Sequence, residues 1–316
     1  MKKSPLLLTL GFLACGVPQE DPSLGQSAAE IQETAPQKVV HRLNAPDNGK
    51  GQGGQLGVGL AKPTGNLTQA GIKYHGGPVM LGTVNAYVIW YGNWSGNTAT
   101  TILPSFLSSI GGSPYWNINT TYTNGSGTKL SNSIAYGGSY QYTGTSGYST
   151  SLSDANIQTI VANTISGGFL PKDTNAVYFV LTSSDVTASS GFCTQYCGWH
   201  THGTISGSDI KYSFVGNPDR CPSSCAAQTT GPNGNAGADG MASIIAHELE
   251  EAATDPDLNA WYDSRGYENA DKCAWTFGTT STAANGSKYN VTLGGKQYLI
   301  QQNWVNSGTG KCAMSF

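Results

Sequence analysis

Two long apolar runs dominate the pattern of hydrophobic positions along the chain, at residues 85–92 and 175–182. Neither run alternates with polar residues, and both have the length of a strand, so we expect two strands that are buried on both faces of a sheet. Residues 211–215 form a shorter run of the same kind. Further strands are predicted near residues 289–293 and 298–304.

Three stretches have apolar residues at helical spacing, and they predict helices at residues 99–110, 154–165 and 240–253. Ser153 and Asp239 stand directly before the second and third stretches and are predicted N-caps. Strand, helix, strand and then a long helix is the order expected of an α/β fold. The sequence therefore predicts a mixed sheet with flanking helices.

The first 70 residues differ from the rest of the chain. Residues 1–14 contain two lysines and then a short apolar core, which is typical of a secretory signal peptide. Cys15 follows at once, as in the cleavage box of a bacterial lipoprotein, and is predicted to carry the lipid; ordinary signal cleavage near the same place is the alternative. Residues 15–70 have few large apolar residues and are predicted to be a flexible tether or propeptide. The folded domain is expected at residues 71–316.

The composition fits a secreted protein, because only 11% of residues are charged and 42 are glycine. A net charge of −3 without a basic stripe excludes nucleic acid as an expected partner. No apolar run reaches the 18 residues of a membrane span. We expect a monomeric, extracellular protein, either secreted or held at the outer surface of a bacterial membrane only through a lipid anchor at Cys15.

Seven cysteines are an odd number for a secreted chain, and a lipidated Cys15 would leave six to pair. Two Cys-x-x-x-Cys pairs could instead form a four-thiolate zinc site, but an oxidising compartment favours disulfides. The sequence does not fix which of the possible pairings is formed. Short loops favour Cys193–Cys197, Cys221–Cys225 and Cys273–Cys312.

Acidic residues are concentrated around the predicted helix at 240–253. Between Asp239 and Asp271 lie nine of the chain's 19 acidic residues, and Arg265 is the one basic residue among them. Such a concentration of like charge needs a use or a counter-ion. The helix contains His247-Glu248-Leu249-Glu250-Glu251, which is similar to the His-Glu-x-x-His helix of zinc peptidases with Glu251 in place of the second histidine.

Residues four apart on a helix share a face, so His247 and Glu251 are predicted to bind one metal ion. Glu248 is rotated by about 100° from His247 and is the candidate general base. Glu268 is the predicted third ligand, and Asp271 is a fourth ligand or a partner of one. The ion is most simply zinc, although the oxygen-rich ligands also suit manganese or calcium.

Other interpretations of these residues remain open. The glutamates of the helix could form a solvated face, with Glu250 as the one most exposed. Asp255 and Asp257 are weaker ligand candidates. His200 and His202 alternate along the chain and could face the metal or stabilise an oxyanion, or could be histidines of a structural loop.

From about residue 74 to the C-terminus the chain resembles the phosphate-induced (Exordium-like) family of secreted proteins. The stretches that carry the resemblance are His75-Gly76-Gly77-Pro78-Val79, Val88-Ile89-Trp90-Tyr91-Gly92, Leu181 to Val186, Gly191 to His200, Phe214-Val215-Gly216-Asn217, Cys221 to Ala226 and Gly237 to Met241.

Plant members of this family are apoplastic, are linked to growth and have no settled biochemical activity; typical ones lack the His-Glu pair. The stretch from His247 to Pro256, together with Trp261-Tyr262-Asp263 and the segment from Glu268 to Cys273, is similar to a pattern in metallopeptidase-like secreted proteins of microbes. The resemblance therefore implies a zincin-like helix and a metal site in a microbial member.

Two functions follow from these observations. The first is a metal-dependent, peptidase-like hydrolase in which Glu248 activates water for attack on a peptide or cell-wall substrate. The second is a non-catalytic extracellular or cell-wall-associated module with a structural metal, in which aromatic residues such as Trp94, Trp116 and Tyr142 could stack on sugars. Glu251 weakens the first, since a second carboxylate makes water at the metal less acidic than histidine ligands do.

Overall fold

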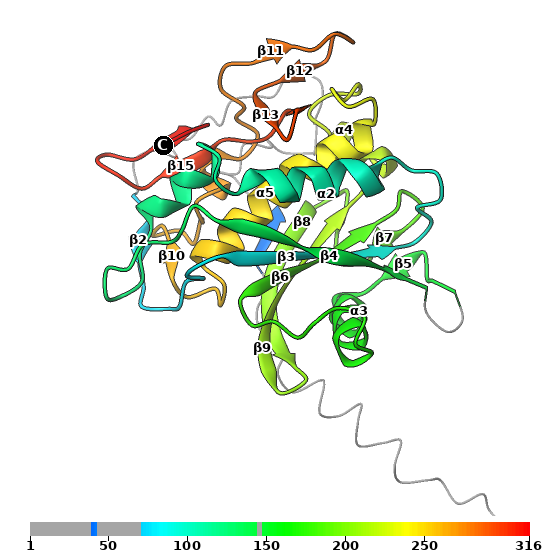
Figure 1. Cartoon of the computed structure of the whole chain (residues 1–316), viewed down its shortest axis with the longest axis horizontal. Helices are drawn as coiled ribbons and strands as arrows, with labels where there is room; N and C mark the ends of the chain where they lie inside the picture. The colour runs from blue at the N-terminus through cyan, green and yellow to red at the C-terminus, as the bar shows by residue number, and fades with distance from the viewer. Residues whose placement is uncertain (1–38, 43–70, 144–146) are drawn as a thin grey trace, which may run out of the picture. The chain divides into compact units, whose positions relative to one another are not determined.

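A six-stranded sheet with the strand order β1-β8-β9-β6-β3-β4 forms the centre of the structure, a computed structural model that describes residues 39–42, 71–143 and 147–316 (Figure 1). The strands of this sheet are β1 (Val39–Arg42), β3 (Val84–Tyr91), β4 (Ile134–Tyr142), β6 (Ala176–Thr182), β8 (Tyr196–Ile205) and β9 (Ser208–Gly216).

The sheet is mixed, as the sequence predicts. Strands β4, β3, β6 and β9 run parallel to one another, whereas β8 is antiparallel to β9 and β1 is antiparallel to β8. The two long apolar runs are β3 and β6, which lie next to each other inside the sheet and are almost completely buried. The predicted run at 211–215 is part of the longer strand β9. The α/β class is therefore confirmed.

Among the described residues, three long helices cover the two faces of the sheet (Figure 1). Helices α2 (Ala99–Ile110) and α5 (Ala236–Thr254) pack against each other on one face, and α3 (Asp154–Ser166) lies on the other. Helices α2 and α3 each bury one apolar face, whereas α5 is buried almost throughout. All three helices are predicted by the spacing of their apolar residues, and for α2 and α3 this spacing results from the burial of one face.

Of the two predicted helix N-caps, one is confirmed and the other is wrong. Ser153 caps α3, as predicted. The predicted cap Asp239 of α5 is wrong, since the helix starts at Ala236 and Asn235 caps it. The carboxylate of Asp239 accepts hydrogen bonds from the backbone and side chain of Asn233 instead, at 2.9 and 2.5 Å.

Strand β8 has no counterpart among the predicted elements, and it matters for the site because it carries His200. It forms a hairpin with β9 in which His200 pairs with Ser213. Both residues of the connecting turn, Ser206 and Gly207, have positive φ angles of 50° and 73°. Positive φ at both positions matches the right-handed twist of the flanking strands, so this turn closes a tight hairpin.

The remaining elements are short. The predicted strand at 298–304 is divided between β14 and β15, with Leu299–Gln302 outside regular strand structure. These elements are β2 (Lys73–Tyr74), η1 (Trp116–Thr121), β5 (Ser151–Leu152), β7 (Thr187–Ala188), η2 (Pro218–Arg220), α4 (Pro222–Cys225), β10 (Trp261–Tyr262), η3 (Asp271–Cys273), β11 (Ser281–Thr282), β12 (Lys288–Tyr289), β13 (Val291–Leu293), β14 (Lys296–Tyr298), β15 (Asn303–Val305) and β16 (Lys311–Ala313).

The predicted signal peptide, the lipidation site Cys15 and most of the predicted tether lie outside the described residues. Strand β1 is the part of the tether that the structure describes, and it pairs with the free edge of β8. Within the described ranges, no helix is both long and apolar enough to cross a membrane.

Three disulfides join the six cysteines of the described residues, and their connectivity partly corrects the prediction. Cys273–Cys312 is confirmed. The two short-loop pairs are wrong, since the bonds are Cys193–Cys221 and Cys197–Cys225. Cys221 and Cys225 are four residues apart at helix α4 and therefore share a face that packs against β8. Each can then reach one cysteine of the opposite segment, and these bonds exclude the four-thiolate zinc site.

Candidate metal centre

Helix α5 is buried on all sides, between the sheet, α2 and the C-terminal strands. Glu248, Glu250 and Glu251 are each 0% exposed. The alternative of a solvated acidic face is therefore wrong. Taking a carboxylate out of water is costly unless it is protonated, paired or bound to a cation, so each of these three groups needs a partner.

Glu250, the glutamate predicted to be most exposed, lies in a buried polar contact instead. The hydroxyl of Tyr115 lies 3.0 Å from Glu250 Oε2 and 2.8 Å from the carbonyl oxygen of Gln301. A tyrosine has one hydroxyl proton, so both contacts are satisfied together when Glu250 carries a proton and donates it. Burial raises the pKa of Glu250 well above its usual value, which agrees with a neutral side chain.

His247, Glu251 and Asp271 form the first of two fully buried groups of metal-ligand type among the described residues. His247 Nε2 lies 3.0 Å from Glu251 Oε1 and 3.5 Å from Asp271 Oδ1. The backbone N–H of Asp271 also donates to Glu251 Oε1, at 2.9 Å. The disulfide at Cys273 anchors the turn η3 that presents Asp271. Asp271 is therefore the third candidate ligand beside the predicted pair of His247 and Glu251.

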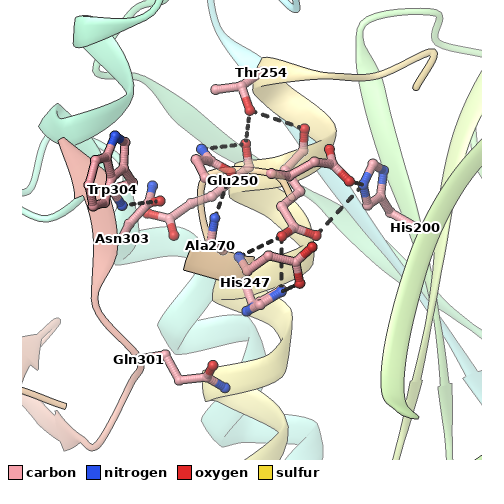
Figure 2. Close-up of polar contacts among 12 residues, drawn as sticks. His200, His247, Glu250, Thr254, Ala270, Gln301, Asn303 and Trp304 are labelled. Carbon is pink, nitrogen blue, oxygen red and sulfur yellow. Dashed lines mark hydrogen bonds and ion pairs between the residues drawn. The ribbon is translucent and has the colours of Figure 1, made fainter. Parts of the chain in front are cut away.

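His200, Glu251 and Glu268 form the second group. His200 Nε2 lies 3.2 Å from Glu268 Oε2 and 3.8 Å from Glu251 Oε2. Glu268, the predicted third ligand, therefore contacts His200 rather than His247. Figure 2 shows His200 on β8 and His247 on α5, each pointing toward the carboxylates that lie between the strand and the helix.

Glu248 lies beside this cluster, against strand β8. A Cβ atom placed on Gly198 would be 3.0 Å from Glu248 Oε1 and 2.6 Å from Ile244 Cγ2. Gly198 is two residues before His200 on the same strand, so both positions face α5. The missing side chain at Gly198 lets α5 approach the strand closely enough for Glu248 to reach the cluster.

The electrostatics of the cluster show an excess of buried negative charge. Burial lowers the pKa of His200 to about 3, so this imidazole is neutral. Burial acts in the same direction on His247, but Glu251, Asp271 and Glu248 together raise the pKa of His247 well above its usual value. Burial and, to a smaller extent, the negative charge of Asp271 raise the pKa of Glu251 to about 7. Burial and, to a smaller extent, the negative charge of Glu251 raise the pKa of Glu268 well above its usual value.

The donor atoms fit a metal ion by type and spacing. Ligand atoms about 2.0–2.2 Å from zinc at tetrahedral angles lie roughly 3.3–3.6 Å from one another. The four His–carboxylate separations in the two groups are 3.0, 3.5, 3.2 and 3.8 Å. Glu268 Oε1 and Glu251 Oε2 are buried and have no hydrogen-bond partner among the described residues, so both offer lone pairs to an ion.

His202 lies in a separate, partly exposed cluster. Its Nδ1 atom is 2.8 Å from Asp209 Oδ1 and 3.6 Å from Asp257 Oδ1, and Lys211 Nζ contacts the same two carboxylates at 2.6 and 3.2 Å. The lysine supplies the positive charge that a metal would supply. The ligand candidate Asp257 therefore has an ordinary ion-pair environment.

Asp255 and His75 have structural contacts. Asp255 accepts hydrogen bonds from the backbone N–H groups of Asn259 and Ala260 at 2.6 and 2.5 Å, just beyond the end of α5. His75 stacks on the Tyr262 ring at 3.7 Å between centroids. The aromatic residues Trp94 and Trp116 lie in the core and do not present a surface for sugars.

Comparison with known proteins identifies the family of this domain. A family model described as the phosphate-induced protein 1 conserved region matches residues 72–315. The chain belongs to this phosphate-induced, Exordium-like family. The match starts at the beginning of the described range 71–143 and includes α5, β8 and η3, so the whole candidate metal centre lies inside the family's domain.

Curated members of the phosphate-induced family resemble the chain over most of its length. Protein EXORDIUM-like 5 of Arabidopsis thaliana is 30% identical over 89% of this chain and 85% of its own length. Protein EXORDIUM-like 3 of the same plant is 30% identical over 86% of this chain and 91% of its own. Protein PHOSPHATE-INDUCED 1 of Nicotiana tabacum is 26% identical, with shares of 72% and 83%. No solved structure gives a significant match.

Proposed function

We propose that the protein is an extracellular metal-binding member of the phosphate-induced family and that its buried His–carboxylate cluster holds a divalent cation. The observation that supports the proposal is the meeting of His200 and His247 with the carboxylates around Glu251, out of contact with water. Imidazole nitrogens favour zinc as the bound ion. Because several of the candidate ligands are carboxylate oxygens, manganese and calcium are further candidates.

The burial of the donors favours a structural role for the cation. A hydrolase needs an opening through which a peptide can reach the reacting groups, yet Glu248 is 0% exposed. A bound cation would instead join three separate parts of the chain, since the donors come from β8, α5 and the segment that carries Glu268 and Asp271. We therefore favour a non-catalytic extracellular module.

The location outside the cell is part of this proposal. Three disulfides are the pattern expected of a chain that folds in an oxidising compartment. Attachment to a membrane through a lipid on Cys15 would keep the domain at the cell surface, where a cell-wall component is the accessible partner.

A metal-dependent, peptidase-like hydrolase is the second candidate, and the position of Glu248 favours it. The cation would supply Lewis-acid activation of a water molecule. Glu248 is close enough to His247 and Glu268 to affect the pKa of each. A general base that accepts a proton from the activated water has to lie in such a position. Catalysis would require α5 and β8 to separate enough to admit a substrate.

Elemental analysis of the purified protein, together with an activity assay, distinguishes these functions. We expect bound metal in wild type and in Glu248→Gln, and no cleavage of a denatured-protein mixture by either. Cleavage by wild type that Glu248→Gln abolishes would establish the hydrolase instead. Absence of metal from wild type, or an unchanged metal content in His247→Ala, would overturn the metal site.

A further inference from the structure

The two oxygens of Glu251 face two different histidines. Oε1 lies 3.0 Å from His247 Nε2, and Oε2 lies 3.8 Å from His200 Nε2. Each histidine also has a second carboxylate of its own, Asp271 for His247 and Glu268 for His200. The cluster therefore consists of two triads that share one carboxylate but use opposite oxygens of it.

Each triad is a set of ligands for a separate ion. Within each, one imidazole nitrogen and two carboxylate oxygens lie within 4.8 Å of one another. One nitrogen and two oxygens are enough protein ligands for a four-coordinate ion with one further position. A carboxylate that uses its two oxygens separately is a natural bridge in two-metal sites, where the ions are about 3.5–4 Å apart.

The charge of the cluster agrees with two ions better than with one. Four carboxylates are buried around the two histidines, and burial acts against the ionisation of any of them that lacks a counter-charge. Two divalent cations match the formal charge of four ionised carboxylates with both imidazoles neutral, whereas with one cation the remaining charge would have to be balanced by protons on carboxylates or on His247. The carboxylates are Glu248, Glu251, Glu268 and Asp271.

We propose that this centre binds two divalent cations bridged by Glu251, one held by His247 and Asp271 and the other by His200 and Glu268. The proposal rests on the metal-binding function proposed above and adds its stoichiometry and its ligands. Zinc and manganese are the ions that suit one imidazole with two carboxylates in each half.

Metal content per chain tests the ligand assignment. After the full-length protein is loaded with zinc and passed through a desalting column, we expect two equivalents in wild type. His200→Gln and His247→Gln should each retain about one, and Glu251→Gln should lose affinity for both. Glu250→Gln is the matched control, because Glu250 neighbours Glu251 and is equally buried but contacts Tyr115 instead of the cluster. It should retain two.

Electron paramagnetic resonance of the manganese-loaded wild type tests whether Glu251 bridges two ions. The measurement needs no substitution, so it does not depend on the folding of a variant. Two Mn²⁺ ions joined by a carboxylate should give an exchange-coupled spectrum. One tightly bound equivalent and an uncoupled spectrum would overturn the two-ion centre while leaving the metal-binding function in place. No bound metal in wild type would overturn both.

Discussion

The close approach of α5 to β8 gives a sharp test of how the site is built. In Gly198→Ala the new Cβ would lie 2.6 Å from Ile244 Cγ2 and 3.0 Å from both Glu248 Oε1 and the carbonyl oxygen of Phe214. Carbon atoms do not pack this closely, so α5 must move outward or the strand must bend. Overpacking of this kind costs about 1–3 kcal/mol. With about 2–4 °C per kcal/mol for a domain of this size, the melting temperature should fall by roughly 2–12 °C.

Gly203→Ala is the matched control on the same strand. Its Cβ would face the other side of the sheet, where the nearest atom is Nε2 of Gln158 at 2.9 Å, the end of a side chain that can turn away. Neither glycine has a positive φ angle, so alanine causes no backbone strain at either position. Thermal unfolding and zinc content should show a loss in Gly198→Ala and little change in Gly203→Ala. Equal stability and equal metal content of the two variants would refute the proposed packing.

Three further predictions concern the bound cation, the disulfides and the buried carboxylate of Asp263. Removal of metal by a chelator should lower the melting temperature by about 8–16 °C, since a ligand at 1,000 times its Kd contributes about 4.1 kcal/mol; an unchanged transition would argue against a structural cation. Peptide mapping without reduction should recover Cys193 joined to Cys221, and recovery of Cys193 with Cys197 would contradict the structure. Although Asp263 is buried, two backbone N–H groups and Lys272 hold its pKa below the usual value. Its ionised form therefore contributes stability above about pH 4 that is lost as the pH falls through the folded-state pKa, and Asp263→Asn should be less stable than wild type at pH 6 but lose less of its remaining stability between pH 5 and pH 3.

The parts of the fold that the sequence predicts are those with a one-dimensional signal. Strands β3 and β6 are buried on both faces, which produces an uninterrupted apolar run. Helices α2 and α3 have one buried face, which produces helical spacing. The pairing of His247 with Glu251 is predicted for a similar reason, because residues four apart on a helix always share a face.

The parts that the sequence does not predict depend on contacts between distant segments. Strand β8 contains histidines, glycines and a cysteine instead of an apolar run, because one of its faces packs on the polar cluster of α5. The weak signal that existed was the alternation of Gly198, His200 and His202, which places all three on one side of a strand. The disulfides of Cys193 and Cys197 depend on where α4 docks, and loop length alone does not contain that information.

Glu251 stands four residues after His247, where a His-Glu-x-x-His sequence would have its second histidine, and its contacts explain why a carboxylate suits this position. An imidazole at this position would offer one nitrogen to one ion, and it would leave His200 and Glu268 without the group that connects them to the helix. A carboxylate offers two oxygens, and here one faces His247 while the other faces His200. The departure from the His-Glu-x-x-His pattern, which weakens the case for a peptidase, is thus the feature that allows the strand and the helix to share one centre.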